Sequence, residues 1–341
     1  MLSPSPRGDR HNFQRFVQES TSAGARVFRK PRSVFWELFF FGQTSPLKGI
    51  FSSTTIGMEL QLKSSRGPFD NDMLAVETMP RPISSNEYYS FGQLLAYCYY
   101  LGLQDIHKDN LLWSPDGLQV IDAEQAFSEL LLPNQTLLLP ANRGITWSAG
   151  LNQLTKSTLE QLAHLEAKSL LDGFLDLTGL FIKDLGAIRS ALLDAVPDFK
   201  RQPIRIFFRG TRDYVEHLEG RSQITNCFED ETVQLARGDV PYFFMLLGGE
   251  GVYFYSSAAW DIQEARVPDA FKKFTVYCAK EPADIFTQSK IEQQWARGML
   301  FLSKKLASLD DRDLAWDSCS ITRESGRLNF VSPSLRMTTK G

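Results

Sequence analysis

The stretch DIHKDNLLWSPDGLQVIDAE, residues 105–124, holds the most distinctive pattern of polar residues in this chain of 341 residues. Within it, SPDG is a turn signal between two short apolar runs, so we predict a β-hairpin. A hairpin turns the chain back on itself and therefore brings Asp122 back beside Asn110. We also predict a helix between Ser84 and Gly102, because apolar residues recur there at helical spacing and glycine follows as a stop signal.

The polar residues of this stretch match the needs of phosphoryl transfer. That reaction requires a carboxylate near the acceptor hydroxyl and oxygen ligands for the Mg²⁺ that accompanies the nucleotide phosphates. Asp105 and Asn110 can supply a base and a metal ligand from one loop, and an acid after the hairpin can supply another ligand. The candidate residues are Asp105, His107, Asn110, Asp122 and Glu124. The alternative is a charged surface loop, which the position of Asp122 directly after an apolar pair disfavours.

A second group of candidates lies near the N-terminus. It consists of Asp9 and His11 in the pattern Asp-x-His, and of Lys30 in the segment KPR. We predict a strand around residues 27–28, and a lysine on an early strand of a nucleotide-binding lobe can neutralise phosphate charge. For the segment KPR alone, an exposed basic turn is the competing interpretation.

A third group lies in PIRIFFRGT, residues 203–211, which we predict to be a strand. Alternate residues of a strand share a face, so Arg205, Arg209 and Thr211 would lie in a row. Two guanidinium groups and a hydroxyl in a row suit a phosphate. A solvated strand face is an equally open interpretation.

The overall composition excludes several classes of protein. The formal charge of −3 does not indicate a nucleic-acid partner, and no apolar run reaches the length of a membrane-spanning helix. The four cysteines form no CxxC pair, so neither a disulfide framework nor a zinc site is expected. We therefore expect a cytoplasmic protein.

The groups of candidates follow one another as motifs do in a known family. GDRHNFQRFV, FRKPRSVFWE, FGQLLAYCYYLGLQDIHKDNLLWSPDGLQVIDAEQAF, PIRIFFRGTRDY and EDETVQLARGDVPYF occur in this order between about residues 8 and 245. Together they resemble the dehydratase domain of class II lanthipeptide synthetases, without the cyclase domain. In that family the five segments correspond to an Asp-x-His-Asn block, a Lys-Pro-Arg block, the Asp-x-His-x-x-Asn and Asp-x-Glu region, an Arg-x-x-x-Arg-x-Thr block and a Gly-Asp-Ile-Pro-Tyr-Phe block.

This resemblance implies an α+β, lipid-kinase-like fold with two lobes that together form one dehydratase-like domain. Residues 1–83 would form an N-lobe with a mixed β-sheet, and residues 84–341 would form a mostly helical C-lobe with added elimination elements. The implied enzyme uses ATP and Mg²⁺ to phosphorylate Ser and Thr of a ribosomally made precursor peptide. It then eliminates the phosphate, which is the dehydration step of lantibiotic biosynthesis.

The resemblance also distributes the roles among the candidates. Asp105, His107, Arg205 and Thr211 would be catalytic, and the last two would serve elimination. Asp9, His11, Lys30 and Arg209 would bind the nucleotide and its phosphates, and Asn110, Asp122 and Glu124 would bind the metal. Ring closure would require a separate cyclase as a partner.

Two alternatives remain open at this point. The protein could be a kinase-only phosphotransferase on a peptide or small molecule. Phe13 and Gln14 stand where a phosphate-binding turn would be expected to carry glycine, and the segment between Glu124 and Arg205 is short for the family. It could also be a non-catalytic remnant that pairs with a separate cyclase.

Overall fold

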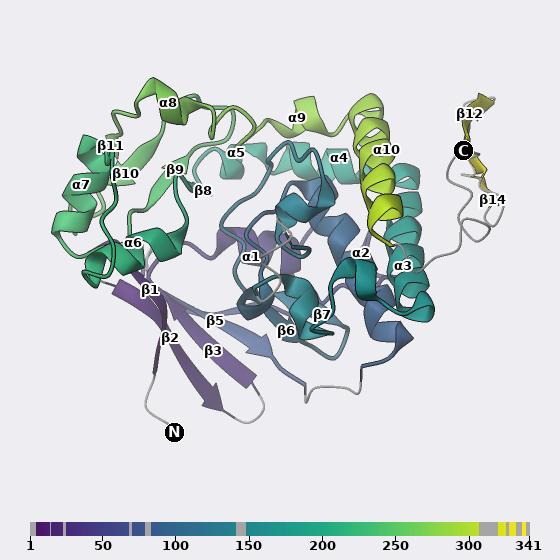
Figure 1. The fold of residues 1–341 in the computed structure, drawn as a ribbon, viewed down its shortest axis with the longest axis horizontal. Helices are drawn as coiled ribbons and strands as arrows, with labels where there is room; N and C mark the ends of the chain where they lie inside the picture. The colour runs from purple at the N-terminus through teal and green to yellow at the C-terminus, as the bar shows by residue number, and fades with distance from the viewer. Residues whose placement is uncertain are drawn as a thin grey trace.

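The computed structural model describes residues 5–13, 15–22, 25–67, 70–78, 83–140, 148–306, 320–324, 327–331 and 336–338. The chain has a mixed α/β fold whose sheets are antiparallel. The largest sheet lies at one corner of the molecule, and α2, α3 and α10 lie together on the opposite side (Figure 1). In the described part, no helix combines the length and apolar character needed to cross a membrane.

The N-terminal sheet has five strands in the order β1-β2-β3-β5-β4. Their bounds are β1 Ser5–His11, β2 Arg15–Ser22, β3 Ala25–Lys30, β4 Gln61–Ser65 and β5 Asn71–Val76. The predicted strand around residues 27–28 is confirmed as β3. Phe28 and Lys30 are both buried because alternate residues of β3 share the face that packs against the rest of the molecule.

Helix α1, Phe35–Phe41, follows β3 and has the sequence FWELFFF, in which five of the seven residues are aromatic. Its rings pack against distant parts of the chain: Trp36 lies 5.6 Å from Phe127 and Phe39 lies 4.7 Å from Phe199, measured between ring centroids. Edge-to-face aromatic contacts of this kind add to the burial of large apolar surfaces. This packing fixes α1 between the N-terminal sheet and the helical part of the molecule.

The predicted helix before the charged stretch is confirmed as α2, Ser85–Leu101. Ser84 and Glu87 form a capping box at its start, and Gly102 ends it in the left-handed conformation with φ of 68°. The predicted hairpin is also confirmed, with β6 Leu111–Trp113 antiparallel to β7 Leu118–Val120. A short 3-10 helix, Lys108–Asn110, leads from the loop after α2 into β6.

A second antiparallel sheet and its helices lie beside the first sheet at the same end of the molecule (Figure 1). The sheet order is β11-β10-β9-β8, with β8 Ile204–Ile206, β9 Phe243–Met245, β10 Tyr253–Tyr255 and β11 Ile262–Glu264. Around it are α6 Thr211–Leu218, α7 Glu229–Ala236 and α8 Asp269–Lys272.

The predicted strand over residues 203–211 is wrong beyond residue 206. The chain bends after β8, and Thr211 is the first residue of α6, with Gly210 before it as the N-cap. The expected row of Arg205, Arg209 and Thr211 on one strand face therefore does not exist. Only Arg205 lies on the strand, where its backbone N–H donates to the carbonyl of Glu124 at 2.9 Å.

The remaining helices complete the helical part of the molecule. They are α3 His164–Lys183, α4 Leu185–Asp194, α5 Val196–Phe199, α9 Pro282–Ile285 and α10 Gln288–Lys305. Short 3-10 turns occupy Pro133–Thr136, Gly150–Gln153 and Leu159–Gln161. A separate three-stranded antiparallel sheet contains β12 Ser320–Glu324, β13 Arg327–Val331 and β14 Arg336–Thr338.

Candidate functional site

The centre of the candidate site is the buried ammonium group of Lys30. Its Nζ donates to Glu37 Oε1 at 2.8 Å, to Asp122 Oδ1 at 2.9 Å and to the carbonyl of Ile121 at 2.6 Å. Lys30 comes from β3, Glu37 from α1, and Asp122 from the residues after β7. One side chain thus joins the N-terminal sheet, the aromatic helix and the end of the hairpin.

Arg32 binds the same carboxylates from the other side. Its Nη2 donates to Glu37 Oε1 and to Asp122 Oδ1, and its Nε lies 3.1 Å from Glu124 Oε1. Burial alone would raise the pKa of both Glu37 and Asp122, but Lys30 and Arg32 reverse this effect and lower the two pKa values. The carboxylates are therefore ionised, and the cluster is a network of full charges.

Arg205 extends the network to the second sheet. Its Nη1 lies 3.2 Å from Glu124 Oε1, and its Nη2 lies 3.2 Å from His11 Nε2. His11 Nδ1 lies 2.9 Å from the carbonyl of Val240, which can only accept, so Nδ1 carries the ring proton. Burial, and then the charge of Arg205, lower the pKa of His11 to about 3. His11 is thus neutral, and its Nε2 accepts from Arg205.

The loop between α2 and the hairpin presents Asp105 and His107. Asn110 holds this loop closed, because its Nδ2 donates to the carbonyl of Asp105 at 2.9 Å. The carbonyl of Asn110 accepts from the N–H of Ile121 at 2.9 Å, so Asp122 follows directly beside Asn110 as the sequence predicts. Burial raises the pKa of Asp105 to about 6, although His107 and Arg205 both oppose this rise.

The carboxylates of Glu37, Asp122 and Glu124 are the groups in the network that could bind a metal ion, but basic side chains already occupy one oxygen of each. Among the described residues, no group of three or more His, Cys, Asp or Glu side chains is arranged to hold a metal. Asp122 and Glu124 each give one oxygen to basic side chains, whereas Glu124 Oε2 and Glu37 Oε2 are buried without a hydrogen-bond partner. A buried carboxylate oxygen with no donor suits a cation, so the oxygen chemistry at Glu124 fits Mg²⁺.

Three predicted residues lie apart from this network or cannot be placed in it. Arg209 pairs with Glu231, with Nε 2.9 Å from Oε1 and Nη2 3.3 Å from Oε2, so it binds α7 rather than the cluster. Thr211 is the first residue of α6, so it does not share the strand of Arg205. Asp9 belongs to β1, but its side chain lies outside the described part of the structure.

Two residues of the network were missed from the sequence. Glu37 has an exposed fraction of 0% and accepts from both Lys30 and Arg32. Its signal is a single acid within the aromatic run FWELFFF, because a carboxylate is rarely fully buried unless it is paired. Arg32 stands in the KPR segment, where Lys30 alone is among the predicted site residues.

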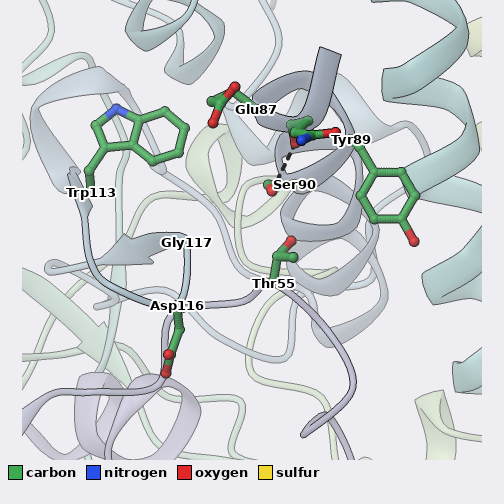
Figure 2. Close-up of a pocket in the computed structure, with 8 residues that line it drawn as sticks. Thr55, Glu87, Tyr89, Ser90, Trp113, Asp116 and Gly117 are labelled. Carbon is green, nitrogen blue, oxygen red and sulfur yellow. Dashed lines mark hydrogen bonds between the residues drawn. The ribbon is translucent and has the colours of Figure 1, made fainter. Parts of the chain in front are cut away.

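A pocket of about 300 Å³ lies elsewhere, between the first turns of α2 and the tip of the hairpin. Figure 2 shows Trp113, Glu87 and Tyr89 around it, with Asp116 at the hairpin turn. None of the predicted residues lines this pocket. The charged network is therefore the better candidate for the functional site.

Comparison with known protein families places the first part of the chain beside one of them. A model of a family described as a domain of unknown function, DUF4135, matches residues 5–160. This family is associated with lanthipeptide synthetase-like proteins. The matched region includes β1 to β7, and therefore Lys30, Glu37 and the hairpin, but it ends before Arg205. No curated protein matches the chain.

Proposed function

We propose that this protein dehydrates Ser and Thr residues of a ribosomally made precursor peptide. It would phosphorylate the hydroxyl group with ATP and then eliminate the phosphate, as in lanthipeptide biosynthesis. The observation that carries the proposal is the buried contact of Lys30 with both Glu37 and Asp122. The family match over residues 5–160 supports the same assignment.

The contact of Lys30 has the form that kinases use. In protein kinases, a lysine on the third strand pairs with a glutamate on a nearby helix, while an aspartate holds the metal ion. Lys30 lies on β3, Glu37 lies on the following helix, and Asp122 follows a hairpin after the loop that carries Asp105. This correspondence supports a kinase-like, two-lobed arrangement with residues 1–83 and 84–341 as the lobes.

In the phosphorylation step, Asp105 would accept the proton of the substrate hydroxyl. Its pKa of about 6 keeps it mostly ionised at neutral pH while leaving it basic enough to accept a proton. Asn110, Asp122 and Glu124 would hold Mg²⁺, which neutralises charge on the nucleotide phosphates. Lys30 and His11, with Asp9, would lie on the nucleotide side.

In the elimination step, Arg205 is the residue best placed to bind the departing phosphate. It has an exposed fraction of 8%, and its Nε is buried without a hydrogen-bond partner. An unused donor on a buried guanidinium can bind an anionic oxygen strongly. Thr211, which the resemblance also assigns to elimination, would act from the start of α6.

The test is incubation of the protein with ATP, Mg²⁺ and a Ser/Thr-rich precursor peptide, followed by mass spectrometry. Dehydration should lower the peptide mass by about 18 Da, one water, per modified residue. Asp122→Asn should abolish any change, whereas Arg205→Ala should leave phosphorylated peptide. Arg266→Ala is a matched control, because Arg266 is 74% exposed and pairs only at the surface with Glu229. Normal dehydration by Arg205→Ala would remove Arg205 from the scheme, and unmodified peptide with wild-type protein would refute the proposal.

A kinase-only activity is the second candidate. It is favoured by the position of Thr211, which the resemblance assigns to elimination but which begins α6 instead of sharing a strand face with Arg205. The same experiment separates the two functions. A stable gain of phosphate mass by the wild-type protein, with no loss of water, would establish the second candidate in place of the first.

A further inference from the structure

The turn between β1 and β2 has an unusual backbone. Asn12 and Phe13 have φ of 48° and 70°, in the left-handed region that favours glycine. This conformation is costly for a residue that carries a side chain, so contacts from the surroundings must hold the turn. His11, which contacts Arg205, is the residue directly before this turn.

Asp239 holds the turn from the other half of the molecule. Its Oδ2 accepts the backbone N–H of Phe13 at 2.9 Å, and its exposed fraction is 0%. The same oxygen lies 2.5 Å from Nε of Arg237. A buried carboxylate oxygen that also faces a guanidinium is a strong acceptor for a backbone N–H.

Arg237 completes the attachment. Its guanidinium lies over the ring of Phe13, 4.1 Å from the centroid, and its Nη1 donates to the carbonyl of Tyr255 at 3.1 Å. The ring of Phe13 also packs against the aromatic cluster of Tyr242, Phe244 and Tyr255. A glycine at position 13 would make neither of these side-chain contacts. The side chain of Phe13 therefore anchors the turn to the second sheet.

We propose that Asp239 is a positioning residue of the site, which holds the β1–β2 turn so that His11 faces Arg205. The geometry links the two directly, because the carbonyl of Val240, next to Asp239, binds His11 Nδ1 and leaves Nε2 for Arg205. The proposal rests on the proposed function for the roles of His11 and Arg205. Under that function, Asp239 keeps His11, on the nucleotide side of the site, aligned with Arg205, on the elimination side.

The experiment compares Asp239→Ala and Asp239→Asn with Asp230→Asn as the matched control. Asp230 is also a buried carboxylate near the second sheet, and it accepts a backbone N–H, that of Arg266, at 2.7 Å. Hydrogen exchange is followed in peptides that contain Phe13. Asp239→Ala should accelerate exchange there by about tenfold or more, because a charge-assisted bond is lost. Asp239→Asn, which keeps an acceptor oxygen, should have a smaller effect.

NMR of the His11 ring supplies a second measurement, which a general loss of stability would not reproduce. In the wild-type protein the signal should stay constant between about pH 5 and 8, since burial and Arg205 lower the pKa of His11 to about 3. In Asp239→Ala the ring should titrate closer to its ordinary pKa of 6.5. The signal is assigned by its absence in His11→Asn.

Equal exchange at Phe13 and an unchanged His11 titration in Asp239→Ala and Asp230→Asn would overturn the proposal. If Asp239→Ala does not fold, Asp239→Asn decides by the same two measurements. Both measurements are made without a peptide substrate. A failure of the proposed function, seen as an unmodified precursor peptide, is therefore distinguishable from a failure of Asp239 to position the turn.

Discussion

Asp105 is the residue at which backbone and side chain are both held in unfavourable states. Its φ of 62° lies in the left-handed region, and burial raises its pKa to about 6. Such strain concentrates at functional sites, where the surrounding contacts hold it. Here the contact is the bond from Asn110 Nδ2 to the Asp105 carbonyl, which fixes the loop regardless of the charge on the carboxyl group.

Replacement of Asp105 by Asn should stabilise the protein at high pH. The folded pKa of about 6 lies above the ordinary value of 3.8, so the protonated carboxyl favours folding fully below about pH 3.8. This contribution is lost as the pH rises through about 6. Because Asn stays neutral, Asp105→Asn should gain on the order of 1–2 kcal/mol over wild type between pH 4 and 8. Urea denaturation at several pH values measures this difference.

The control for this prediction is Asp109→Asn, on the exposed side of the same loop, where the side chain is 64% exposed. This variant should change the free energy of unfolding by less than about 0.5 kcal/mol, as substitutions of exposed side chains usually do. A gain in Asp105→Asn that is the same at pH 4 and pH 8 would contradict the raised pKa.

The location of a single site residue could be predicted only where a local sequence pattern fixes its place in the structure. Asp122 and Asn110 were predictable because a hairpin between them fixes their separation. Glu37 was not, because its partners Lys30 and Arg32 precede α1 in the chain, and no spacing in the sequence shows that they turn back onto it. Arg209 was misplaced because its partner Glu231 lies on α7, whose approach no spacing within residues 203–211 could reveal.

At the scale of elements, α2 and α3 pack against each other, and α2 leads into the loop that carries Asp105 and His107. Their close approach depends on two glycines. A Cβ atom on Gly92 of α2 would lie 1.9 Å from the carbonyl oxygen of Leu170, and one on Gly173 of α3 would lie 2.0 Å from that of Tyr89. Neither carbonyl can move without shifting a whole helix. The glycines therefore set the distance between the helices, and with it the position of the loop that follows α2.

Alanine at these two positions should destabilise the protein despite its better helix propensity. We expect Gly92→Ala and Gly173→Ala each to lower the free energy of unfolding by about 2–4 kcal/mol, since the helices must separate to admit a methyl group. Gly186→Ala in α4 is the control, because open space surrounds Gly186 and propensity alone should add up to about 1 kcal/mol. Thermal denaturation of the three variants tests this, and a stabilised Gly92→Ala would contradict the packing.

The elements themselves were predictable to the degree that local signals decide them. The capping box at Ser84, the stop at Gly102 and the SPDG turn each act within a few residues, and α2 and the hairpin lie where these signals predict. The segment after Ile206 has strand-forming residues, yet it bends, because Gly210 and Thr211 begin a helix there. The strand propensity of these residues was outweighed by the start of α6, which the sequence pattern alone did not show.

At the scale of the whole molecule, one charged network connects parts of the chain that are far apart in sequence. Lys30 comes from the first sheet, Arg32 from the bend after β3, and Glu37 from α1. Glu124 comes from the segment after the hairpin, and Arg205 from the second sheet. Burying such charges costs free energy that only their mutual pairing offsets. Removal of one partner should therefore harm stability more than removal of an opposite pair.

A double-mutant cycle on Lys30 and Glu37 tests whether this network holds the molecule together. Lys30→Met leaves the carboxylates in excess and Glu37→Gln leaves the basic groups in excess, so each should cost about 3 kcal/mol. The double variant restores the balance and should cost less than the sum, with a coupling energy of roughly 1–3 kcal/mol. Lys168→Met with Asp172→Asn is the control cycle, because that pair is exposed on α3 and should couple by less than about 0.5 kcal/mol. If the buried pair couples no more strongly than the exposed one, apolar contacts rather than this ion pair hold β3 and α1 together. The charges of Lys30 and Glu37 would then serve only binding and chemistry.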